Sequence, residues 1–210
     1  MTKTQKEPEI TPWDRRPWHL RGDADDRTVY QHVGQFLSFW ERYEAALAYP
    51  FASFFGPFLL SDLARRSYFA VRTFEGRAEM LRAASSTFFD ARKSPELLKR
   101  FADLLGVAVQ FSQRRNDIAH GFVDQFQTQE QWQKFGWMLD VEGFALYPSL
   151  ASFKGRDTRA IPSYCMTSNE LTYFYDEVVK LQPKTIALAD DIFKHGRSTP
   201  FGMPPPPSPT

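Results

Sequence analysis

The sequence has 210 residues but only one cysteine, Cys165, so it cannot form an internal disulfide bond. A lone thiol is typical of a reducing compartment, and we therefore expect a cytoplasmic protein. Cys165 has no thiol or base close to it in the sequence, which favours a small buried residue. Clusters of histidine, cysteine or paired carboxylates at the spacing of metal ligands are missing as well, so we expect neither a metal nor a cofactor.

An excess of one charge is also missing, because 26 Lys and Arg residues face 25 Asp and Glu residues and leave a formal net charge of +1. This balance argues against a protein that binds nucleic acid through bulk charge, although it is compatible with a local basic patch. Long hydrophobic runs are absent too. The most apolar stretch, residues 46–60, is too short to span a membrane and is interrupted by Pro50 and Gly56-Pro57. We expect no membrane segment and interpret this stretch as a buried aromatic connection between helices.

Hydrophobic residues recur at helical spacing along most of the chain, and 20 of the residues are phenylalanines. The pattern predicts a mainly α-helical fold, an up-and-down bundle of four to five helices with a small β hairpin before the last helix. The predicted helices span residues 28–50, 61–89 and 95–120, and a last one starts at residue 167. Pro50 should end the first, and Pro183 should kink or interrupt the last. Thr167 and Glu170 form a capping-box pattern.

Apolar and polar residues alternate over residues 137–146 around Glu142-Gly143, which predicts the hairpin. The predicted organisation is a flexible arm over residues 1–26, a helical domain over 27–196 and a disordered proline-rich tail over 197–210. The helical domain includes the β insertion at about 132–164. Four consecutive prolines in the tail suit either a docking segment for a protein partner or a solubilising tail.

The stretch QRRNDIAHG, residues 113–121, closes the third predicted helix, which Gly121 should stop. On a helical wheel Arg115 falls on the apolar stripe of that helix, where a charge is costly unless it is paired or faces a cleft or an interface. Asn116 and His120 are four residues apart and share one flank. Arg115 and His120 are separated by a less favourable step of five.

Arginine, asparagine and histidine together suit phosphodiester chemistry. A neutral histidine can take a proton from an attacking hydroxyl, and an arginine can stabilise the charge of the transition state. The same residue types also suit a structural role in the last turn of a helix, because Arg and His there complement the helix dipole. The spacing alone leaves both interpretations open.

The stretch RRNDIAHG resembles the R-x4-6-H motif of the HEPN superfamily (higher eukaryotes and prokaryotes nucleotide-binding) in its common form R-N-x-x-x-H, carried here by Arg115, Asn116 and His120. FEGRAEMLRAA and IPSYCMTSNEL are similar to uncharacterised bacterial proteins of this kind. The resemblance implies a helical bundle that pairs as a homodimer, with two motifs facing each other. It also implies metal-independent cleavage of single-stranded RNA in defence or stress response.

By this resemblance His120 would be the general acid and base, Arg115 would stabilise the transition state, and Asn116 would position the phosphate or His120. Arg114 and Arg77 are candidate substrate-binding residues, and for Arg77 a solvated salt bridge is the alternative. Other members of the superfamily bind without cutting. The second hypothesis is therefore a non-catalytic binding or scaffold module, in which the motif caps a helix and braces a protein interface.

Overall fold

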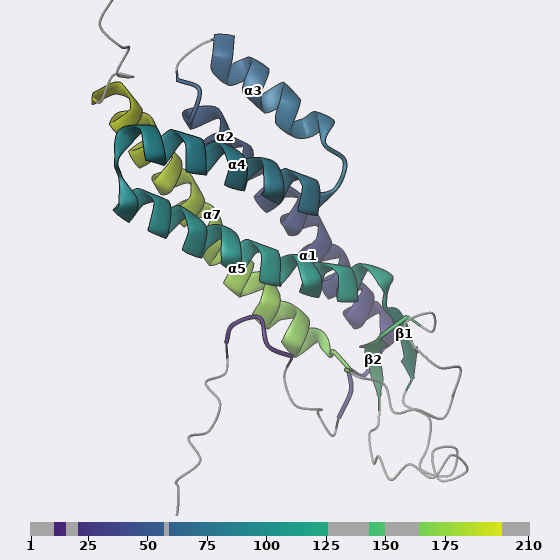
Figure 1. Cartoon of the computed structure of the whole chain (residues 1–210). Coiled ribbons are helices and arrows are strands. Elements are labelled where there is room, and N and C mark those ends of the chain that lie inside the picture. Colours follow the sequence, from purple (N-terminus) through teal and green to yellow (C-terminus); the bar gives the residue numbers. More distant parts are fainter. Residues whose placement is uncertain (1–10, 16–20, 57–58, 126–142, 150–163, 199–210) are drawn as a thin grey trace, which may run out of the picture. The chain divides into compact units, whose positions relative to one another are not determined.

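The computed structural model describes residues 11–15, 21–56, 59–125, 143–149 and 164–198 (Figure 1). The described chain is mainly helical, and its elements are α1 (Asp26–Ala46), α2 (Ala48–Ser53), α3 (Leu59–Ala70), α4 (Phe74–Arg92), α5 (Pro95–His120), β1 (Phe122–Gln125), β2 (Phe144–Tyr147) and α7 (Ser168–Ser198). The predicted helical fold with a small hairpin before the last helix is confirmed. Among the helices of the described residues, none combines the length and the apolar character needed to cross a membrane.

The chain forms two compact units. Unit 1 consists of Met1–Phe39 and Gln113–Glu177, and unit 2 consists of Trp40–Ser112 and Val178–Thr210. The helices α1, α5 and α7 therefore contribute residues to both units. The sequence predicted a single helical domain with an arm and a tail. Residues 1–10 and 16–20 of that arm, and residues 199–210 of the tail, lie outside the described residues.

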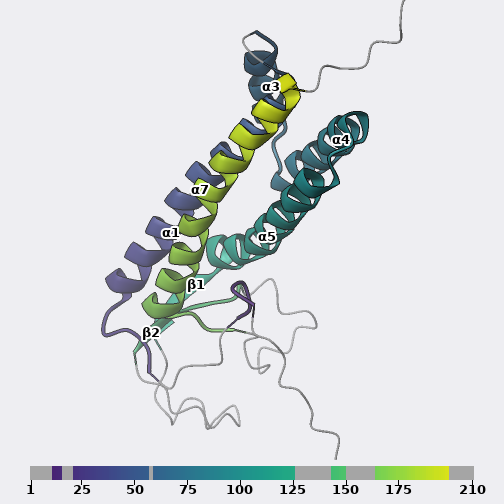
Figure 2. The same ribbon diagram turned by 90° about the vertical axis from the view of Figure 1, so that its left-hand side faces the viewer.

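The core of unit 2 is aromatic. The ring of Phe54, just after α2, lies 5.1 Å from Phe88 and 5.8 Å from Phe89 of α4, and 5.4 Å from Phe101 of α5, between ring centroids. These contacts join α4 to the first half of α5, and the two helices run side by side in Figures 1 and 2.

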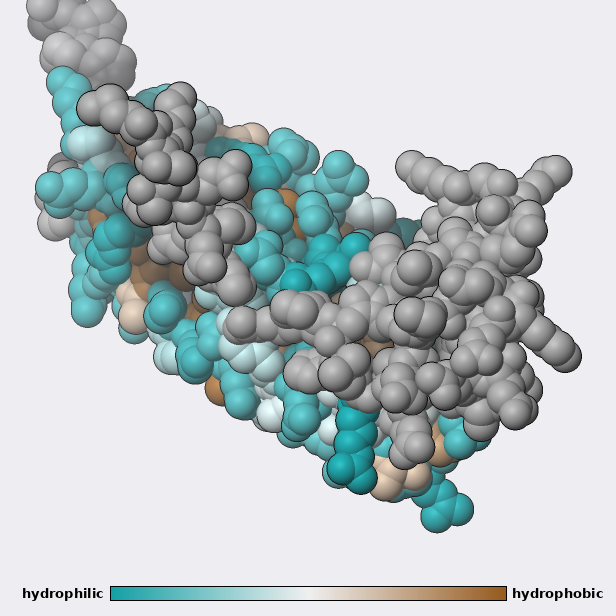
Figure 3. Space-filling model, turned by 90° about the horizontal axis from the view of Figure 1, so that it is seen from below, coloured by the Kyte–Doolittle hydropathy of each residue, from teal (hydrophilic) through white to brown (hydrophobic). Residues whose placement is uncertain are grey.

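On the face shown in Figure 3 most described residues are hydrophilic, and hydrophobic ones form small patches between them.

The predicted helix over residues 61–89 is wrong in one respect, because it is interrupted between Ala70 and Phe74 and forms two helices, α3 and α4. The hydroxyl of Thr73 caps α4 by accepting a hydrogen bond from the Gly76 N–H at 3.2 Å. A Cβ on Gly76 would lie 2.9 Å from the Val71 side chain. Gly76 therefore fits the close turn at the start of α4 and does not lie in the middle of a long helix.

The two prolines of the predicted helices behave differently from each other. Pro50 does not end α1, which stops at Ala46, and lies in the first turn of α2, where its missing N–H is not needed. Pro183 lies inside α7 and does not interrupt it. The start of α7 is as predicted, because the Glu170 carboxylate accepts hydrogen bonds from the Thr167 backbone N–H, at 2.8 Å, and from the Thr167 hydroxyl.

The hairpin is antiparallel, with Phe122 opposite Tyr147 and Gln125 opposite Phe144. Its first strand was predicted at residues 137–141, which lie outside the described residues, whereas β1 directly follows α5. Only residues 143–149 and 164 of the predicted β insertion are described. Cys165 packs with Ala145 and Tyr147, and burial raises the pKa of its thiol to about 12. The prediction of a buried cysteine is confirmed.

Candidate functional site

The motif occupies the last two turns of α5, in unit 1. Arg115 is half-buried, and it lies between Phe111 and Ile118, two fully buried residues of the apolar stripe. Its Nη1 donates a hydrogen bond to the Asn116 Oδ1 at 3.3 Å. The wheel position predicted for Arg115 therefore leaves the guanidinium at the edge of the core, next to the Asn116 amide.

His120 is the last residue of α5, and its side chain is exposed. Within the described part of the chain it forms no hydrogen bond, ion pair or ring contact. Asn116 is exposed as well and contacts Arg115. The structure thus brings Arg115 and Asn116 together. No described interaction joins His120 to Arg115, which is five residues away on the helix, or to Asn116, although a step of four places Asn116 and His120 on the same flank.

Arg114 faces a different set of side chains. Its Nη1 lies 2.9 Å from the Asp117 carboxylate, an ionic contact without hydrogen-bond geometry, and its side chain is only 12% exposed. Burial lowers the pKa of Arg114. Arg15 holds the same carboxylate with two bonds of 3.0 Å from its Nη2 and one of 3.3 Å from its Nε. Arg114 is therefore engaged in an ion pair with Asp117.

Tyr164 completes this group, which we call the Asp117 cluster: Arg15, Arg114, Asp117 and Tyr164. The guanidinium carbon of Arg15 lies 4.5 Å from the centroid of the Tyr164 ring. The Tyr164 hydroxyl donates a hydrogen bond to the Asp117 carbonyl oxygen at 2.9 Å, and burial raises the pKa of Tyr164 to about 12. Side chains from three distant parts of the sequence therefore meet on the last turns of α5.

Arg15 and Asp117 were not among the site residues predicted from the sequence. The sequence does contain a signal for the Arg114–Asp117 ion pair, because residues three apart are neighbours on a helix surface. Arg15 was assigned to a flexible arm, yet it binds Asp117. Asp23 of the same arm exchanges two backbone hydrogen bonds of 2.8 Å with Phe144, and its carboxylate accepts one of 2.7 Å from the Ser168 N–H. The described arm residues are therefore held by specific contacts.

Arg77 belongs to unit 2, whereas the motif belongs to unit 1. Its guanidinium pairs with Glu44, and its Nε donates to the Val71 carbonyl oxygen at 2.8 Å. The side chain is 16% exposed, so the pair is largely buried and not solvated. Arg77, like Arg114, is therefore engaged in a largely buried ion pair.

Gly121 explains the close approach of β2 to the end of α5. The helix stops before Gly121, as predicted, although the backbone of Gly121 is not left-handed, unlike that of Gly143. A Cβ on Gly121 would lie 2.8 Å from both the Leu146 side chain and the Tyr147 carbonyl oxygen. Glycine is needed here because a strand packs directly against it, next to His120.

We expect Gly121→Ala to destabilise the protein by about 1–3 kcal/mol, because the carbonyl oxygen of β2 has to move away. Gly106→Ala is the matched control on the same helix, since nothing lies within 4 Å of the added methyl group. It should stabilise the protein by about 1 kcal/mol through helix propensity. Urea unfolding measures both, and equal effects of the two substitutions would contradict the close contact.

The two units differ in charge. Unit 1 has 12 Lys and Arg against 15 Asp and Glu residues, a net charge of −3, and unit 2 has 14 against 10, a net charge of +4. The unit that carries the motif therefore has no excess of positive charge to attract RNA, and contacts there would depend on individual side chains.

Metal ligands are not grouped in the described residues, where no cluster of three or more His, Cys, Asp or Glu side chains is arranged to hold an ion. The chemistry that the motif offers is that of an accessible imidazole, a guanidinium and an amide at the end of one helix. Comparisons of this chain with protein-family models, curated proteins and solved structures found no match.

Proposed function

We propose that this protein is a metal-independent endoribonuclease of HEPN type that cleaves single-stranded RNA at a composite site between two copies of the chain. The observation that supports this most is the exposed His120, which has no described partner. A histidine that caps a helix bonds its carbonyl oxygens, whereas a general acid or base has to reach the substrate. We further propose that the protein acts in the cytoplasm, in bacterial defence or stress response.

In this proposal the neutral imidazole of His120 takes the proton of a ribose 2′-hydroxyl. The 2′-oxygen then attacks phosphorus, the bond to the 5′-oxygen breaks, and an imidazolium returns a proton to that oxygen. The products are a 2′,3′-cyclic phosphate and a 5′-hydroxyl. Arg115 donates hydrogen bonds to the non-bridging phosphate oxygens, and Asn116 holds its guanidinium in place.

A second copy of the chain is part of the proposal for a geometric reason. Residues five apart on a helix point about 140° away from each other, so one copy does not aim His120 and Arg115 at the same point. Two antiparallel copies can place the His120 of one beside the Arg115 of the other. The half-buried Arg115 then also faces an interface.

A non-catalytic binding or scaffold module is the second candidate. Two observations favour it: Arg114 and Asp117, both within the motif stretch, are used for packing, and unit 1 has a net charge of −3. In that case Arg115 and His120 contact a protein partner. The proline-rich tail, of which residues 199–210 lie outside the described residues, is a further candidate docking segment for such a partner.

The test is cleavage of a varied pool of single-stranded RNAs by the full-length protein in EDTA. We expect 2′,3′-cyclic phosphate ends, and a rate at least about 100-fold lower for His120→Ala and for Arg115→Ala. Gln113→Ala is the matched control, an exposed residue of the same helix end outside the motif, and should cleave like the wild type. Sedimentation of the wild type should show a dimer of the 24.3 kDa chain.

Failure of the wild type to cleave above the His120→Ala background would reject the ribonuclease. If the same two substitutions instead weaken dimerisation or lower the Tm, the binding module is the better description. Circular dichroism of each variant separates loss of function from loss of fold.

A further inference from the structure

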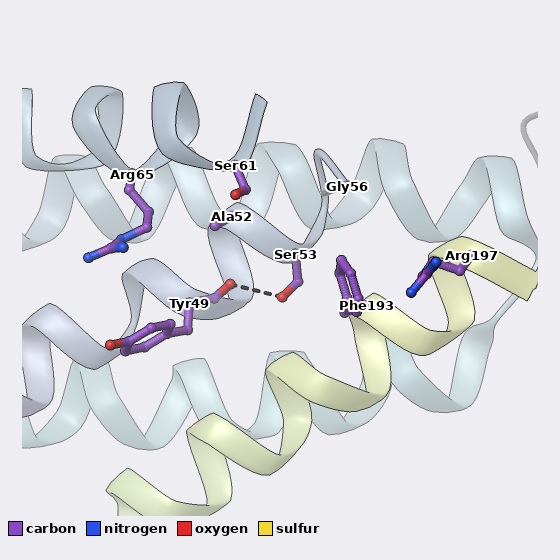
Figure 4. Close-up of a pocket in the computed structure, with 8 residues that line it drawn as sticks. All are labelled: Tyr49, Ala52, Ser53, Gly56, Ser61, Arg65, Phe193 and Arg197. Carbon is purple, nitrogen blue, oxygen red and sulfur yellow. Dashed lines mark hydrogen bonds between the residues drawn. The ribbon is translucent and has the colours of Figure 1, made fainter. Parts of the chain in front are cut away.

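A pocket of about 480 Å³ lies in unit 2, where residues of α2, α3 and the end of α7 meet (Figure 4). Its volume is within the range of about 300–1,000 Å³ found for small-molecule sites. Residues that define its chemistry are Tyr49, Ser53, Ser61, Arg65, Phe193 and Arg197. No residue of the motif stretch lines it, so it is independent of the RNA site proposed above.

Two arginines, each stacked on an aromatic ring, characterise this pocket. The guanidinium carbon of Arg65 lies 5.5 Å from the centroid of the Tyr49 ring, and that of Arg197 lies 5.6 Å from the centroid of the Phe193 ring. Arg65 comes from α3 and Arg197 from α7, and Figure 4 shows them at opposite ends of the pocket. A ring contact restrains a guanidinium while its N–H groups stay able to bind an anion.

The two cations have no carboxylate partner within the described part of the chain. Arg66, the neighbour of Arg65 on α3, does have one, because its Nε bonds Asp62 at 3.0 Å. Among the described residues no Asp or Glu lines the pocket, and the Ser53 hydroxyl donates a hydrogen bond to the Tyr49 carbonyl oxygen at 3.0 Å. The charged side chains that line the pocket are therefore both cationic, in a unit whose net charge is +4.

We propose that this pocket binds a small organic bisphosphate. Phosphate suits the planar fork of a guanidinium, which donates two parallel hydrogen bonds to two phosphate oxygens. The placement of one arginine at each end favours a ligand with two anionic groups over a ligand with one. The rings of Tyr49 and Phe193 supply apolar walls for the organic body between the phosphates.

Calorimetric titration of the full chain in a phosphate-free buffer of low salt tests the proposal. The probes are fructose 1,6-bisphosphate, fructose 6-phosphate and inorganic phosphate. We expect the bisphosphate to bind at least about tenfold more tightly than either other probe. Arg65→Ala and Arg197→Ala should each weaken bisphosphate binding at least about tenfold, whereas Arg66→Ala, with its guanidinium paired to Asp62, should leave it unchanged.

Three results would overturn the proposal: no binding of the bisphosphate at about 5 mM, equal affinity for the bisphosphate and the monophosphate, or an equal loss in the Arg66→Ala control. Arg65, Arg66 and Arg197 are exposed, so the variants should keep the wild-type Tm, which is measured in parallel. His120→Ala should bind the bisphosphate like the wild type. Failure of the ribonuclease proposal and failure of this one are therefore distinguishable.

Discussion

Glu44→Ala should lower the stability of the protein by about 3 kcal/mol and its Tm by about 6–12 °C. Glu44 is 6% exposed and pairs with Arg77, and it also accepts a hydrogen bond of 3.1 Å from the Trp40 Nε1. Its backbone carbonyl accepts another of 3.2 Å from the Tyr68 hydroxyl. Removal of the carboxylate leaves a largely buried cation and a buried indole N–H without their acceptor, which costs more than the loss of an exposed pair.

Glu79→Ala is the control for Glu44→Ala. Glu79 pairs with Arg82 on the surface of α4, and its loss should change the Tm by no more than experimental error. The double variant Glu44→Ala/Arg77→Met should recover part of the loss, because it removes the uncompensated charge together with its partner. Equal Tm values for the Glu44→Ala and Glu79→Ala variants would show that the buried pair contributes no more to stability than the exposed pair.

Asp117→Ala should lower stability by about 2 kcal/mol and the Tm by about 4–8 °C. The substitution removes the common acceptor of Arg15 and Arg114 and leaves Arg114, at 12% exposure, without a counter-ion in the Asp117 cluster. We expect less than for Glu44, because Arg15 is more accessible to water and can be solvated there. Thermal and urea unfolding of the full chain measure the effect.

A double-mutant cycle separates the Arg15–Asp117 contact from other effects of Asp117→Ala. Arg15→Ala and Asp117→Ala should be non-additive by about 1 kcal/mol. The exposed Lys99–Asp103 pair on the same helix is the control, and its cycle should show no measurable coupling. Arg15→Ala should also make the segment around residues 11–15 more sensitive to limited proteolysis. Additive effects and unchanged proteolysis would contradict the anchoring of this segment to α5.

Local signals predicted α5 well. Pro95 at its first position, hydrophobic residues at helical spacing and Gly121 after its end predicted the bounds that the structure has. The Thr167–Glu170 pattern predicted the start of α7 in the same way. These features were predictable because a helix end is stabilised by groups within three or four residues of each other.

The end of helix α3 at Ala70 and the strand β1 were not predicted from the sequence. The interruption after Ala70 is short, and β1 has only four residues, too few for a pattern of alternation to stand out. β1 is stabilised by its pairing with β2, which lies 19 residues further along the chain. A pairing between residues so far apart in the sequence does not produce a recognisable pattern within a short stretch of residues.

The candidate site, too, has features that helical spacing predicts and features that depend on contacts between distant segments. The sequence by itself determined that Arg115, Asn116 and His120 share the end of one helix and that Arg115 lies on its apolar stripe, because helical geometry depends only on spacing. Only the tertiary structure decided that Arg15 shares the Asp117 carboxylate with Arg114 and that Arg77 is bound by Glu44. The reason is physical: whether a guanidinium is available for a ligand depends on its distance to carboxylates from other segments, and that distance exists only after the chain has folded.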